Sequence, residues 1–130
     1  MSGHHRPRLL LDFDGVLHTY TGWNGGQLES PLTKARHACM LLAEQFELVC
    51  FTARANSPEG QALVEAWLAR WGFPIKRVTA MKEAAVLCVD DRAICFEGEW
   101  NDTLLARIRA FHPYWEPRAA VLEEHNNESG

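Results

Sequence analysis

Two carboxylates at the end of an apolar run could do chemistry together. Asp12 and Asp14 follow the run Leu9-Leu10-Leu11 and are followed by Gly15. Alternate residues of an extended strand point to the same side, so both carboxylates can converge on one ligand, and glycine then lets the chain turn sharply. Two negative charges this close favour a divalent cation, a shared proton or a bound phosphate between them. The alternative is a solvated turn in which Asp14 only caps the backbone, since turns also favour Asp and Gly.

Further polar side chains follow in a fixed order along the chain. One apolar run ends in Thr52, and Lys82 precedes another run that ends in Asp90 and Asp91. Each pattern alone is weakly specific. The ordered set, together with the Asp-x-Asp-Gly pattern, resembles the four motifs of the haloacid dehalogenase (HAD) superfamily of phosphohydrolases. The resemblance covers about residues 8–100 and is strongest to small uncharacterised members from bacteria and phages.

The resemblance implies a role for each motif residue. Asp12 is expected to attack the phosphorus and form an aspartyl-phosphate, and Asp14 to act first as general acid and then as general base. Thr52 is expected to donate its hydroxyl to a phosphate oxygen, and Lys82 to stabilise charge beside the phosphate and Asp12. Lys76 is the rival lysine, but it falls inside an expected strand before the site, so we predict Lys82.

The resemblance also implies a magnesium ion. A dianionic phosphate approached by carboxylates needs a hard cation, and Mg²⁺ is commonly held by one or two carboxylates together with phosphate and water. Asp12, the backbone carbonyl of Asp14 and one member of the Asp90-Asp91 pair are the expected ligands. We predict Asp91 as the direct ligand and Asp90 as a partner that acts through water.

Four other side chains are candidates for contact with the substrate, and for each a second interpretation stays open. The guanidinium groups of Arg54 and Arg92 suit phosphate recognition, but either can instead brace the aspartates. His18 follows the first motif and could line the entrance with Tyr20, or it could be a solvated loop histidine. Trp23 could stack on a ring of the substrate or fold over the apolar edge of the domain.

Alternating apolar strands and amphipathic helices must position these groups. The expected strands are residues 8–13, a run through residue 52, residues 75–79, a run ending at residues 90–91, and residues 93–96. Helices are expected to begin at Ser30-Pro31 and Ser57-Pro58, where a capping hydroxyl precedes a proline, and near Asn101. This order predicts an α/β fold, a Rossmann-like core with a mostly parallel sheet and helices on both faces. Ligands of such sheets bind beyond the carboxyl ends of the strands, where all four motifs end.

Length and composition predict one enzyme domain. The chain has 130 residues, so we expect a single domain over 1–130, with a core of about 8–113 and a polar tail over 114–130. The net charge of −4 gives no basic footprint for nucleic acid. Trp67 and Trp71 lie on an apolar helical stripe and are expected in the core.

The cysteines and the hydropathy pattern favour the cytoplasm. The chain has no apolar run of the roughly 18 residues that a membrane span needs. The four cysteines show no C-x-x-C spacing, so free thiols are expected rather than disulfides or zinc: Cys39, Cys50, Cys88 and Cys95.

The expected activity is that of a capless, Mg²⁺-dependent phosphatase. Only residues 18–30 and the helix near residues 58–71 leave room for the cap that many HAD members carry, so the site is expected to be open. An open site suits a nucleotide, a nucleic-acid end or a phosphoprotein, or closure by an oligomeric partner. Phosphotransfer to another acceptor needs the same residues. A receiver-like signalling module that keeps its phosphate is a further alternative, and a stable aspartyl-phosphate would distinguish it.

Overall fold

A computed structural model describes residues 6–116, which form two compact units, one up to Asp90 and one from Asp91 onward. Most of the expected polar tail, residues 117–130, lies outside the described residues. That the whole chain makes one hydrolase domain stays a prediction.

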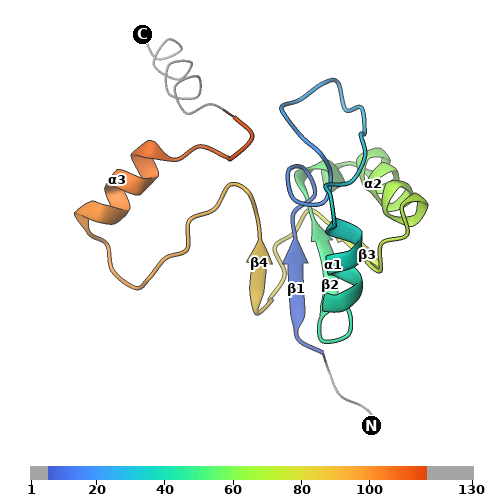
Figure 1. The fold of residues 1–130 in the computed structure, drawn as a ribbon, viewed down its shortest axis with the longest axis horizontal. Coiled ribbons are helices and arrows are strands. Elements are labelled where there is room, and N and C mark those ends of the chain that lie inside the picture. The colour runs from blue at the N-terminus through green and yellow to red at the C-terminus, as the bar shows by residue number, and fades with distance from the viewer. Residues whose placement is uncertain (1–5, 117–130) are drawn as a thin grey trace. The chain divides into compact units, whose positions relative to one another are not determined.

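The first unit is built on a parallel sheet of four strands (Figure 1). The spatial order is β3-β2-β1-β4, and all three neighbouring pairs are parallel. The strands are β1 (Arg8–Leu11), β2 (Glu47–Phe51), β3 (Arg77–Thr79) and β4 (Leu87–Val89). The predicted α/β class with a parallel sheet is therefore confirmed. Backbone pairing continues for one residue beyond the strands, because the N–H of Asp12 donates to Val89 O and that of Thr52 to Thr79 O.

Two helices cover one face of this sheet. They are α1 (Ala35–Leu42) and α2 (Pro58–Arg70), and a short 3₁₀ helix, η1 (Ala53–Asn56), precedes α2. Leu9 and Leu11 of β1 share a buried cluster with Cys39 of α1 and Trp67 of α2. The prediction for Trp67 is confirmed, whereas Trp71, the residue that caps the C-terminus of α2, is 38% exposed, so the prediction for Trp71 is wrong.

The two proline-based start signals behave differently. Ser57 caps α2 as predicted, because its hydroxyl accepts the N–H of Gly60. The expected start of α1 at Ser30-Pro31 is wrong, since α1 begins only at Ala35. Residues 30–32 instead pair with residues 17–19: the N–H of Thr19 donates to Ser30 O, and that of Leu32 donates to Leu17 O.

The second unit contains one helix in its described part, α3 (Asp102–Ala110). Asn101 caps it by accepting the N–H of Leu104 at 2.9 Å, which confirms the predicted start. The predicted strand over residues 93–96 is wrong, because these residues are irregular and pair with no strand of the described chain. Among residues 6–116, no helix is long and apolar enough to cross a membrane.

Candidate functional site

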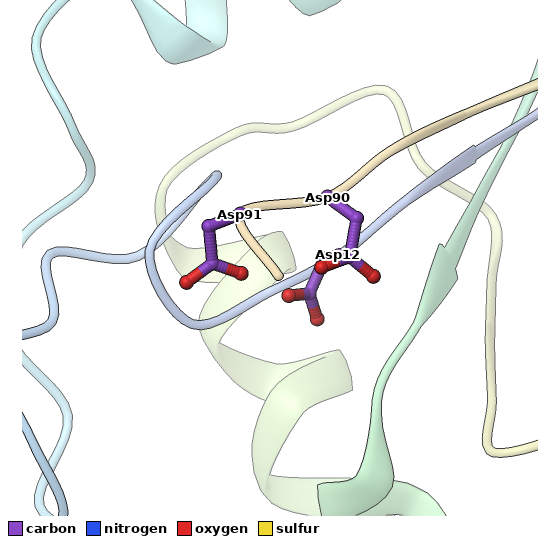
Figure 2. A group of neighbouring side chains, drawn as sticks. All are labelled: Asp12, Asp90 and Asp91. Carbon is purple, nitrogen blue, oxygen red and sulfur yellow. The ribbon is translucent and has the colours of Figure 1, made fainter. Parts of the chain in front are cut away.

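Three carboxylates gather at the carboxyl edge of the sheet. Asp12 follows β1, and Asp90 and Asp91 follow the neighbouring β4. One oxygen from each of the three carboxylates lies within 4.8 Å of the other two, and all three residues are partly buried (Figure 2). The backbone bond from Asp12 N–H to Val89 O, 3.0 Å long, aligns the two strand ends. The local cause is the parallel pairing of β1 with β4, which brings both carboxyl ends to one edge.

The donor set of this cluster fits a hard divalent cation. Carboxylate oxygens are the ligands that Mg²⁺, Mn²⁺ and Ca²⁺ prefer, and three of them within reach of one point leave further positions for water or phosphate. Within the second unit, the indole N–H of Trp115 donates to Asp91 Oδ2 at 2.6 Å and orients that carboxylate. The set is not specific to Mg²⁺.

The side chain of Asp14 belongs to a different network. Arg54 donates two hydrogen bonds to its carboxylate, from Nε to Oδ2 at 2.8 Å and from Nη2 to Oδ1 at 3.0 Å. His18 Nδ1 lies 2.9 Å from Oδ1. Burial by itself would raise the pKa of Asp14, but the hydrogen bonds from His18 and Arg54 outweigh it, and the pKa is lowered. Asp14 is therefore held as a carboxylate.

His18 is a buried support for Asp14. Its ring is 1% exposed and stacks on Phe13 with 4.9 Å between centroids. The backbone N–H of Glu29 donates to Nε2 at 2.6 Å, so Nε2 carries no proton and the ring proton sits on Nδ1, from which it is donated to Asp14. Both ring nitrogens are used. The structure thus revises the predicted place of His18 at the entrance.

Arg54 braces the first motif, which is one of the two roles the sequence left open. Its side chain is 8% exposed, and beyond Asp14 its Nη1 donates to Gly26 O at 3.4 Å. The guanidinium carbon lies 5.7 Å from the ring centroid of Phe13 and 5.0 Å from that of Trp23. Arg92, in the second unit, pairs with Glu116 at 3.6 Å.

Thr52 lies buried at the end of β2, at the same edge of the sheet as Asp12. It is 4% exposed, and its Oγ1 accepts the N–H of Arg54 at 3.2 Å, which caps η1. Accepting this bond leaves the hydroxyl proton available for donation. The predicted contact with phosphate therefore stays a prediction, with a second, structural role now assigned to the same side chain.

The structure separates the two rival lysines. Lys76 lies directly before β3, at the amino edge of a parallel sheet and so opposite the aspartates. Lys82 lies exposed in the connection before β4. The pKa of the Cys88 thiol is raised, first by burial and then by the charges of Asp90 and Asp12, while Lys82 acts in the opposite direction. Lys82 thus lies close enough to β4 for its charge to act on the Cys88 thiol.

Sequence reasoning missed the way in which Asp14, His18 and Arg54 act as one group. Asp14 and His18 are four residues apart in a turn, where the N–H of Gly15 donates to His18 O, but 40 positions separate Asp14 from Arg54. The spacing of the first pair was a usable local signal. The contact with Arg54 depends on β1 and β2 pairing in the register Leu11↔Cys50, which no local pattern shows.

Comparison with protein-family models and with curated proteins finds no match to this chain. Among solved structures, it is similar to a conserved protein from Bacteroides thetaiotaomicron, with a TM-score of 0.57 and 16% sequence identity. The match covers 80% of this chain and 89% of the other. At this identity the likeness concerns the fold alone.

Proposed function

We propose that this chain is a metal-dependent phosphohydrolase that forms an aspartyl-phosphate on Asp12, the activity that its resemblance to the HAD superfamily implies. The observation that carries the proposal is the meeting of Asp12, Asp90 and Asp91 at the carboxyl edge of the sheet, one oxygen from each within 4.8 Å. That edge is where parallel α/β sheets bind ligands. The buried hydroxyl of Thr52 ends the adjacent strand.

Mg²⁺ is the cation we assign to the acidic cluster. When bound, it would supply charge neutralisation for a phosphate dianion and for the carboxylates around it. Asp12, Asp90 and Asp91 would hold it, with the backbone carbonyl of Asp14 as a further candidate. Free thiols are stable in reducing compartments, and Cys39, Cys50, Cys88 and Cys95 are all free, so we place the activity in the cytoplasm.

The proposed reaction divides into two displacements. A carboxylate oxygen of Asp12 forms a bond to phosphorus as the bond to the leaving oxygen breaks, and water then cleaves the acyl phosphate to restore Asp12 and release phosphate. Thr52 and Lys82 would bind the phosphoryl oxygens. Asp14, held ionised by Arg54 and His18, suits the second step, in which a base takes a proton from water. To protonate a leaving group it would first have to gain a proton within that network.

The experiment that tests this proposal is hydrolysis of an aryl phosphate with Mg²⁺ and with excess EDTA. We expect turnover that needs the cation and that Asp12→Asn abolishes, because an amide of the same shape is a poor nucleophile. Asp102→Asn, at the exposed start of α3, is the matched control and should retain the rate. Undiminished turnover in EDTA, or in Asp12→Asn, would contradict the proposal.

A further inference from the structure

Trp23 presents a large ring to solvent beside Arg54, the residue that holds the Asp14 carboxylate. Trp23 is 67% exposed to solvent, although burial of an indole ring is strongly favourable. The guanidinium carbon of Arg54 lies 5.0 Å from the ring centroid, and the same guanidinium grips Asp14. A single side chain therefore separates the Trp23 ring from the first motif.

The loop that carries Trp23 has a backbone shaped for this presentation. Gly22, Gly25 and Gly26 have φ angles of 130°, 80° and 87°, a region that other residues rarely adopt. A Cβ on Gly26 would lie 3.4 Å from Cη2 of Trp23, so the ring packs directly over this glycine. This contact holds the ring against the part of the loop that follows the tryptophan.

The loop is also tied down at two later points. Arg54 Nη1 donates to Gly26 O at 3.4 Å. The backbone of Glu29 is held from both sides, because its N–H donates to His18 Nε2 at 2.6 Å and its carbonyl accepts the indole N–H of Trp67 at 2.8 Å. The groups that tie the loop, Arg54 and His18, are the same groups that hold Asp14. The exposed ring is thus held in a fixed position relative to Asp14.

We propose that Trp23 determines specificity by stacking on a planar ring of the substrate, so that the preferred substrates are phosphate esters of ring-bearing groups such as aryl alcohols or nucleosides. This inference rests on the proposed phosphohydrolase function. An exposed indole face stacks on any flat π system, and the contact requires no hydrogen-bond pattern. The guanidinium beside the ring adds a cation–π contact that holds the indole in place for its ligand.

The test uses two phosphonates that cannot be hydrolysed, 2-phenylethylphosphonate and ethylphosphonate, with binding measured by calorimetry in the presence of Mg²⁺. Stacking on an aromatic side chain commonly changes affinity by about 5- to 150-fold, so the ring-bearing phosphonate should bind the unmodified chain tighter by a factor in that range. Trp23→Leu should remove this preference, and Trp23→Tyr should restore most of it. The matched control is Trp71→Leu, because Trp71 is also partly exposed and also lies over an arginine, Arg70 at 5.7 Å, but at the end of α2.

The outcomes separate this inference from the function on which it rests. Equal affinity for the two phosphonates, or a preference that survives Trp23→Leu, overturns the role of Trp23 and leaves the phosphate site in place. Loss of the preference in Trp71→Leu as well would assign it to a general effect of tryptophan removal and would also overturn the role. Failure of both phosphonates to bind contradicts the phosphate site itself, and with it the inference.

Discussion

At the scale of single residues, the two aspartates of the first motif have separate tasks in spite of their spacing. Asp12 joins the acidic cluster with Asp90 and Asp91. Asp14 accepts three bonds from Arg54 and His18. The resemblance assigns different roles to the two residues, but no local pattern predicts their different contacts, because Asp14 is bound by the guanidinium of Arg54, which follows β2. The two carboxylates therefore have different partners, although only one residue separates them in the sequence.

The pair formed by Asp14 and Arg54 predicts a pH-dependent stability. Arg54→Met should destabilise the fold at pH 7 by about 3 kcal/mol, the lower range for losing one partner of a buried pair. The pKa of Asp14 is lowered from 3.8, so the contribution of the pair is present above that value and is lost as the pH falls through the folded pKa. The difference in the free energy of unfolding between the unmodified chain and Arg54→Met, measured by urea unfolding, should become smaller below pH 3.8.

A matched pair on the surface controls for this experiment. Nη2 of Arg77 lies 2.6 Å from Oε1 of Glu83, and the two side chains are 46% and 26% exposed. Arg77→Met should lower the free energy of unfolding much less than Arg54→Met does, as is usual for exposed ion pairs. If Arg54→Met and Arg77→Met lower the free energy of unfolding equally at pH 7, the buried pair stabilises the fold no more than the exposed one, which contradicts the prediction.

The acidic cluster makes a prediction about its own members. Asp91→Asn should raise the Mg²⁺ concentration for half-maximal activity by about tenfold or more, since an inner-sphere carboxylate supplies both charge and a bond. Asp90→Asn should raise it less. Titration of activity against Mg²⁺ in both variants gives the order, and the opposite order would make Asp90 the direct ligand.

At the scale of elements, two similar Ser-Pro patterns differ in outcome: one begins a helix and the other does not. Ser57-Pro58 begins α2, where the Ser57 hydroxyl caps the first turn by accepting the N–H of Gly60. Ser30-Pro31 has the same chemistry, but its backbone pairs with residues 17–19, and the helix starts later, after Lys34 with its φ of 68°. Long-range pairing of this kind outweighs a local capping preference, and no pattern within the segment reveals it.

This difference predicts the effects of two matched substitutions. Ser57→Ala should cost about 1 kcal/mol, because the N–H of Gly60 loses its acceptor at the first turn of α2. Ser30→Ala should stay within about 0.5 kcal/mol, since the Ser30 side chain caps no helix in the described residues. Thermal or urea unfolding of both variants measures this. A larger loss for Ser30→Ala would contradict the assigned helix starts.

At the scale of the whole molecule, the sequence predicted the succession of parallel strands and the sheet edge at which polar residues gather. Apolar runs show where buried strands lie, and parallel connections bring their ends to one edge. The predicted strand over 93–96 failed because a short apolar run such as Ala93-Ile94-Cys95-Phe96 does not by itself distinguish a strand from irregular chain. The sequence left a bracing role open for Arg54 but could not decide it, since the contact of Arg54 with Asp14 exists only once β1 and β2 have paired.

The central claim is that Asp12 becomes phosphorylated during turnover, and the most direct measurement is the mass of the peptide that carries it. An aryl phosphate and Mg²⁺ are added to Asp14→Asn, in which the water-activating carboxylate is missing, and the reaction is quenched in acid. We predict a phosphoryl group on Asp12 and a stoichiometric burst of phenol. Hydrolysis without phosphate on Asp12, or with the label on another residue, would contradict the account.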